Sequence, residues 1–167
     1  LELARRAGKL ERFQYVSTCY VSGRFPGIFR ERDLERGQSF NNFYEESKYL
    51  AEVEVRRAAS AGLPTTVYRP GIVVGDSKSG ATQKYDGPYP ILRWLLKQPT
   101  VAVLPVPSDV DRLRANLVPR DFVVDAVAAL SELPAAVGTT YQLADPDPPT
   151  IDEVITAMGE ATARVVA

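Results

Sequence analysis

The feature that most constrains the fold is an alternation of strand-like and helix-like segments along the 167 residues. Residues 13–21 and 65–68 are rich in aromatic and β-branched residues, which predicts strands. Between them, Asn41 or Asn42 can cap a helix that runs to about Ala61. Strands that alternate with helices are typical of an α/β fold with a mainly parallel sheet. No linker interrupts the pattern, so we expect one domain.

Two later helices carry recognisable start signals. Asp121 is expected to cap a helix over residues 122–133, which has an apolar stripe. Thr150 and Glu153 have the S/T-x-x-E spacing of a capping box, which predicts a last helix after Thr150. Further strands are expected at residues 72–74, 101–106 and 140–144.

The composition excludes several classes of function. The chain has no histidine, which removes Ser-His-Asp and Cys-His catalysis and every histidine-ligated metal site, so no metal is expected. The net charge of -1 gives no sign of nucleic-acid binding. No apolar run approaches the roughly 20 residues of a membrane helix. The single cysteine, Cys19, fits a reducing cytoplasm, and we expect it to be a small buried residue.

Acid-base chemistry must then come from other side chains, and Tyr44 and Lys48 are the best placed. Four residues apart on a helix, they share one face. A cation beside a phenol favours the phenolate and lowers its pKa, which suits the phenol to pass a proton to or from a carbonyl or alcohol oxygen. The stripe through both residues continues to Ala51, Val55 and Ala58, and we expect this face to lie on the sheet.

The spacing alone is weak evidence, because a tyrosine packed under a lysine stem would look the same. A second feature favours chemistry. Ser17 and Thr18 stand where the strand of residues 13–21 leads into a glycine turn, and parallel sheets bind ligands at the carboxyl ends of their strands. A hydroxyl there can hold a substrate oxygen. The alternative is a hydroxyl that bonds only to the local backbone.

Taken together, these motifs resemble the extended short-chain dehydrogenase/reductases. The resemblance rests on Ser17-Thr18, on Tyr44-x-x-Ser47-Lys48 and on Tyr68-Arg69-Pro70-Gly71, and it runs from about Phe13 to Met158. It implies a doubly wound, mainly parallel Rossmann-type sheet with a small substrate-binding lobe. The Rossmann part would take about residues 1–75 and 116–145, and the lobe about 76–115 and 146–167.

The resemblance also implies roles for individual residues. Thr18 matches the catalytic hydroxyl, Tyr44 the proton donor, and Lys48 the residue that lowers the tyrosine pKa and holds the nicotinamide ribose. Pro70, Gly71 and Ile72 match the segment that contacts the nicotinamide end of NAD or NADP. The implied activity is NAD(P)-dependent reduction of an acyl thioester, an aldehyde or a ketone, the thioester being carried by coenzyme A or a carrier protein.

Within the family, the segment from Arg69 to Asp76 is most similar to fatty acyl-CoA reductases and thioester reductases. Epimerases and dehydratases that act on nucleotide sugars often have Asn at the position of Ile72, and they are the alternative class of enzyme. A third possibility is a module that binds a dinucleotide or a partner without turnover.

The Gly-rich phosphate loop of the family has no counterpart here, so we expect a fragment that lacks the N-terminal half of its fold and is inactive alone.

Overall fold

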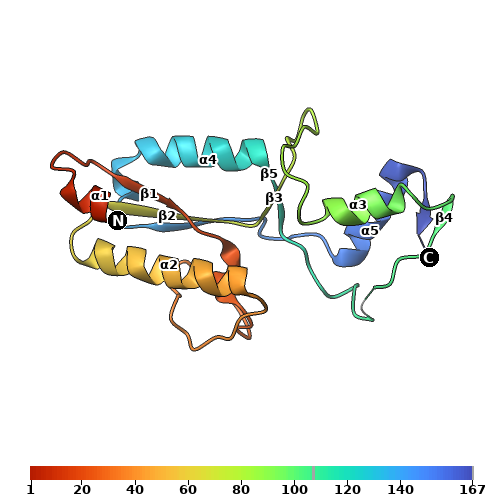
Figure 1. Cartoon of the computed structure of the whole chain (residues 1–167), viewed down its shortest axis with the longest axis horizontal. Coiled ribbons are helices and arrows are strands. Elements are labelled where there is room, and N and C mark those ends of the chain that lie inside the picture. Colours follow the sequence, from red (N-terminus) through yellow and green to blue (C-terminus); the bar gives the residue numbers. More distant parts are fainter. Residues whose placement is uncertain (107, 167) are drawn as a thin grey trace. The chain divides into compact units, whose positions relative to one another are not determined.

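The structure is a computed structural model that describes residues 1–106 and 108–166 of the chain (Figure 1). It divides into two units. The first takes Leu1–Gly71 and Asp121–Ala144, and the second takes Ile72–Arg120 and Asp145–Ala167.

Three parallel strands form the sheet of the first unit. They are β1 (Phe13–Val16), β2 (Thr65–Pro70) and β6 (Thr140–Leu143), in the order β1-β2-β6. Every residue of the central strand β2 is buried. Helix α2 (Phe43–Ser60) covers one face of this sheet and α4 (Arg120–Glu132) the other (Figure 1). The expected doubly wound, mainly parallel α/β class is therefore confirmed.

Local sequence explains where α2 begins and ends. The side chain of Asn42 accepts a hydrogen bond from the backbone N–H of Glu45 at 3.0 Å, which satisfies one of the free donors of the first turn. At the other end, the N–H of Gly62 donates to Ala59, and Gly62 has a φ of +99°, which disfavours side chains with a Cβ. The predicted helix between Asn42 and Ala61 is confirmed.

Two predicted boundaries are wrong. The first strand ends at Val16 instead of residue 21, because Thr18 caps a short 3-10 helix, η1 (Cys19–Ser22), that turns the chain away from the sheet. Helix α4 begins at Arg120, so Asp121 lies within the first turn instead of capping it. The first boundary is set by a local bond, since the Thr18 hydroxyl accepts from the N–H of Tyr20 two residues later.

The face that α2 lays on the sheet also differs from the prediction. Val55 and Ala58 are buried as expected, but Ala51 is exposed. The buried stripe instead includes the carboxylates of Glu45 and Glu52, which hydropathy places in solvent. Burying a carboxylate requires partners: Glu45 accepts from the backbone N–H of Asn41 at 2.9 Å, and Glu52 accepts from Ser17 and Arg69.

The second unit contains two small parallel pairings. Strand β3 (Ile72–Val74) pairs with β5 (Leu117–Pro119), and β4 (Val101–Ala102) pairs with β7 (Val165–Val166). The strand expected at residues 101–106 is thus confined to two residues. Leu95 of α3 (Tyr89–Leu95), Ala102 and Met158 of α5 (Ile151–Thr162) form the core.

The predicted capping box of α5 is confirmed, since Thr150 and Glu153 each bond to the other's backbone. The remaining elements are short: α1 (Glu2–Arg6) and η2 (Pro134–Ala136). Within residues 1–106 and 108–166, no helix combines the length and the apolar character needed to cross a membrane.

Candidate active site

Ser17 and Thr18 follow the last residue of β1 and are both buried. The Thr18 hydroxyl accepts a hydrogen bond from the N–H of Tyr20 at 3.3 Å and lies 3.4 Å from the carbonyl oxygen of Pro70, a long and weak contact. Thr18 and Pro70 are therefore neighbours at the carboxyl ends of adjacent strands. The Ser17 hydroxyl is engaged elsewhere, since it donates to Glu52 at 2.5 Å.

Tyr44 lies in the first turn of α2 with 58% of its surface exposed. Among the described residues its hydroxyl has no hydrogen-bond partner, neither Thr18 nor Lys48, so it is free to meet a ligand. This exposure argues against a tyrosine packed beneath the lysine stem. Burial raises the pKa of Tyr15 on β1, and the charges of Glu52 and Tyr44 add to this shift.

Lys48 is half-buried one turn further along the helix, and its ammonium donates to the carbonyl oxygen of Val16 at 2.8 Å. The same nitrogen lies 5.3 Å from the centre of the Tyr15 ring, within the range of a cation–π interaction. Burial lowers the pKa of Lys48, while the nearby Glu52 carboxylate opposes that shift. An ammonium has three N–H donors, so Lys48 retains donors for a ligand beyond the bond to Val16.

Pro70 and Gly71 occupy the end of β2. The N–H of Gly71 donates to the carbonyl of Leu143 at 3.1 Å, which fixes this turn against β6. Ile72 is the first residue of the second unit and begins β3, opposite Leu117. The first unit thus brings Thr18 beside Pro70 and Lys48 beside the end of β1, whereas Ile72 belongs to a separate unit.

Cys19 is half-buried, less enclosed than expected. Burial raises its pKa to about 11, against smaller lowering effects of hydrogen bonds and of Arg69. Burial likewise raises the pKa of Tyr20 to about 12. Neither group is poised to exchange a proton near neutral pH, so among these neighbours Tyr44 and Lys48 remain the candidates for proton transfer.

Sequence reasoning missed Glu52 and Arg69, which are both fully buried and form an ion pair with a nitrogen-oxygen distance of 2.7 Å. A signal was present in the sequence. Arg69 lies inside a strand of otherwise uncharged residues, and an arginine in a central strand must find a partner. The partner could not be identified, because Glu52 is 17 positions away on another element.

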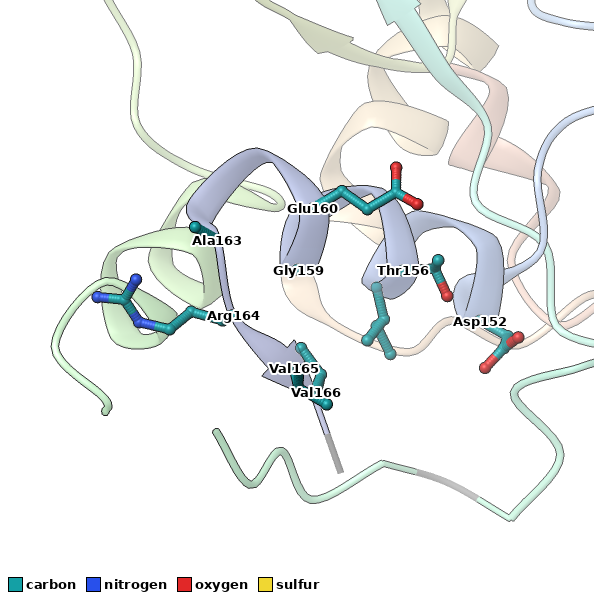
Figure 2. A pocket seen from close by; sticks show the side chains of 9 residues that line it. Asp152, Thr156, Gly159, Glu160, Ala163, Arg164, Val165 and Val166 are labelled. Atoms are coloured by element: carbon teal, nitrogen blue, oxygen red, sulfur yellow. The ribbon is translucent and has the colours of Figure 1, made fainter. Parts of the chain in front are cut away.

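A cavity of about 350 Å³ lies in the second unit, lined by α5 and β7 (Figure 2). Its polar lining includes Asp152, Thr156 and Glu160, and it contains none of the predicted site residues. Across the described ranges no group of three His, Cys, Asp or Glu side chains is arranged to hold a metal ion. The predicted site residues Tyr44, Lys48 and Thr18 offer a phenol, an ammonium and a hydroxyl.

The chain matches one protein family and is similar to several known proteins. The model of an NAD-binding family described as male sterility protein matches residues 1–127. A linear gramicidin synthase protein of Brevibacillus parabrevis is 29% identical over 157 residues, which are 91% of this chain and 3% of that protein. Glycine betaine reductase ATRR of Emericella nidulans is 36% identical over 105 residues, which are 63% of this chain and 8% of that protein.

Among solved structures, the terminal R domain from the myxalamid PKS-NRPS biosynthetic pathway superimposes with a TM-score of 0.81 at 31% identity. The match covers 98% of this chain and 40% of that domain. The chain therefore spans only part of the length of these proteins, from 3% and 8% of the two sequence relatives to 40% of the R domain.

Proposed function

The chain belongs to the NAD-binding male sterility family, and we propose that it forms part of an NAD(P)-dependent reductase of acyl thioesters or aldehydes. The observation that carries the proposal is that Tyr44 is exposed and has no hydrogen-bond partner among the described residues, one helical turn before Lys48, whose ammonium bonds to the end of β1. Similar proteins whose names include a reductase support the choice of reaction.

The residues present fit the nicotinamide end of a dinucleotide. Lys48 keeps N–H donors that can bind ribose hydroxyls, and Pro70-Gly71 offers backbone at the carboxyl end of β2, where open α/β sheets bind ligands. No glycine-rich phosphate loop occurs in the sequence, so these residues account for one end of the cofactor only. When bound, the nicotinamide supplies the hydride.

In the proposed mechanism, Tyr44 gives its phenolic proton to the substrate oxygen while Lys48 holds the ribose and stabilises the phenolate. Thr18 orients the substrate oxygen, which requires its hydroxyl to exchange the weak contact with Pro70 for the substrate. An aldehyde then gains one hydride and one proton and becomes an alcohol. A thioester gains the same pair and separates into an aldehyde and a thiol.

We further propose that the substrate is carried by coenzyme A or by a carrier protein, and that the second unit forms the substrate-binding lobe. The irregular segment of residues 76–88 in that unit has the character of a binding loop.

The test is to incubate the full-length protein with NADPH and either octanoyl-CoA or octanal, and to follow NADPH absorbance together with the products. We expect oxidation of NADPH that depends on the acyl substrate and matches the product formed. Conversion of a nucleotide sugar with no net loss of NADPH would instead indicate an epimerase. Cofactor binding with no turnover of any of these substrates would indicate a non-catalytic module.

A further inference from the structure

A buried ionic cluster lies in the first unit at the carboxyl ends of β1 and β2. It consists of Ser17, Glu52, Arg56 and Arg69. The Glu52 carboxylate is its centre, because it accepts from Ser17 at 2.5 Å, from Arg56 at 3.1 Å and from Arg69 at 2.7 Å. Glu52 and Arg69 are completely buried. Each oxygen of the carboxylate is thus engaged, and the donors come from α2, from β2 and from the residue that follows β1.

Three members of the cluster adjoin the residues proposed for the reaction. Ser17 directly precedes Thr18, Arg69 directly precedes Pro70, and Glu52 lies one helical turn after Lys48. Because one carboxylate holds the ends of both strands and α2, a displacement of any one of these elements alters the spacing of the other two. The geometry at Thr18, Tyr44 and Lys48 therefore depends on a side chain that touches none of the reacting atoms.

The two arginines also secure the long loop between η1 and α2. Arg69 donates to the carbonyl oxygens of Arg30 and Asp33, and Arg56 donates to those of Glu31 and Arg32. This loop has no helix or strand of its own to satisfy those carbonyls. It leads directly into the turn of α2 that carries Tyr44, so the cluster also fixes the approach of the chain to that residue.

We propose that Glu52 is a positioning residue that sets the spacing of Thr18, Tyr44 and Lys48 through Ser17 and Arg69. This inference rests on the proposed function for the meaning of that spacing. The competing explanation is that the cluster contributes to stability alone. Buried ion pairs are often no more stabilising than apolar packing of the same volume, so the two explanations must be separated by a property of the site.

The property that separates the two explanations is the ionisation of Lys48. Two groups face the Lys48 ammonium: the Tyr15 ring from β1, and the Glu52 carboxylate from the next turn of α2. Glu52 is the anionic one and opposes the lowering of the Lys48 pKa by burial. Removing its charge must therefore let Lys48 lose its proton at lower pH, and the alkaline limit of activity must move to lower pH with it.

The experiment compares Glu52→Gln with Glu54→Gln in the full-length protein, with NADPH and octanal as probes. Glu54 is the matched control, since it lies on the same helix in an exposed pair with Arg57. We expect Glu52→Gln to lower kcat at least about tenfold, with a smaller change in KM, and to move the alkaline limb to lower pH. Glu54→Gln leaves both unchanged. Equal kcat and equal pH profiles in the two variants would overturn the proposal.

A second variant covers the case in which Glu52→Gln does not fold. Ser17→Ala leaves the ion pair between Glu52 and Arg69 in place and removes the link to β1. We expect kcat to fall at least about fivefold while the melting temperature stays close to that of the wild type. Wild-type kcat in Ser17→Ala would contradict the positioning role.

A measurement without substrate separates this inference from the proposed function. Titration of the Lys48 ¹³Cε resonance, assigned by its loss in Lys48→Arg, reports the ionisation of Lys48 directly. A lower midpoint in Glu52→Gln or a broadened, displaced Lys48 signal in Ser17→Ala supports the coupling even if no reductase activity is found. An unchanged resonance in both variants refutes it even if the enzyme proves to be a reductase.

Discussion

At the scale of single residues, Tyr44 and Lys48 have different surroundings although they share one face of α2. The Tyr44 phenol is exposed and has no hydrogen-bond partner among the described residues, whereas the Lys48 ammonium bonds to Val16 and lies over the Tyr15 ring. An exposed phenol one helical turn from a fixed cation suits a group that must exchange a proton with a bound ligand.

The first prediction concerns Tyr44→Phe in the full-length protein. Because only the hydroxyl is removed, we expect kcat to fall roughly 10²- to 10⁴-fold, the usual contribution of a general acid. The affinity for NADPH should stay within a few-fold. Steady-state kinetics and calorimetric titration measure the two effects.

Tyr49→Phe is the matched control for this prediction. Tyr49 lies on the same helix and contacts Phe40 through its ring, a contact that phenylalanine keeps. Its kcat should equal that of the wild type. If Tyr44→Phe also turns over at the wild-type rate, Tyr44 does not donate the proton.

The second prediction concerns Cys19, whose pKa is raised to about 11 by burial. The thiolate is the reactive form, so at pH 8 iodoacetamide should modify folded Cys19 at least about tenfold more slowly than the urea-unfolded chain. The rate should rise as the pH approaches the raised pKa. Mass spectrometry of the tryptic peptide of residues 13–24 measures it. Equal rates in the folded and unfolded protein would show that the thiol is not protected.

At the scale of elements, α5 shows how local sequence fixes a helix. The Thr150 hydroxyl accepts from the N–H of Glu153 at 3.1 Å, and the Glu153 carboxylate accepts from the N–H of Thr150 at 2.7 Å. Both backbone donors would otherwise be free at the helix start. The helix ends at Ala163, a non-glycine residue in the left-handed region with a φ of +52°.

The third prediction is that Thr150→Ala destabilises the second unit by about 1 kcal/mol, the usual effect of losing an N-cap. Thr156→Ala is the control, because Thr156 is an exposed residue inside the same helix. It should change the free energy of unfolding by less than about 0.5 kcal/mol. Urea unfolding followed by circular dichroism compares the two variants, and equal midpoints would show that the capping box contributes nothing measurable.

At the scale of the whole molecule, each unit has a distinct structural character. The first unit is built on a three-stranded parallel sheet in which β1, at one edge, pairs only with β2 among the described residues. An open edge presents unpaired backbone groups that can bind another strand. Among the described residues, the strands of the second unit form two pairings of two or three residues, a single bridge joins Arg114 to Thr150, and the unit has a small core around Leu95.

The fourth prediction concerns residues 1–167 taken alone. The cofactor pyrophosphate is normally held by N–H groups at the start of a helix that follows a glycine-rich loop, and this sequence contains no such loop. We therefore expect no binding of NADPH with micromolar affinity and a tendency to aggregate through the β1 edge. Calorimetric titration, circular dichroism and light scattering measure these properties. A folded monomer with micromolar affinity would contradict the prediction.

The sequence by itself determined the features that depend on short-range interactions. The α/β class, the cap of α2 at Asn42 and the capping box of α5 follow from periodicity and from hydrogen bonds that span three or four residues. The position of Thr18 just after a strand follows from the same kind of local pattern, whereas Lys48 reaches the end of β1 only through a tertiary contact with Val16. Their roles in catalysis remain predictions.

Tertiary structure alone decided which charged residues are buried and where short strands form. Glu52 is buried because Arg69 of β2 and Ser17, which follows β1, both donate hydrogen bonds to its carboxylate. Strands β5 and β7 exist because each meets a partner far away in the chain. Local patterns carry no information about such partners, because the energy of burying a charge or pairing a strand depends on what the fold places opposite it.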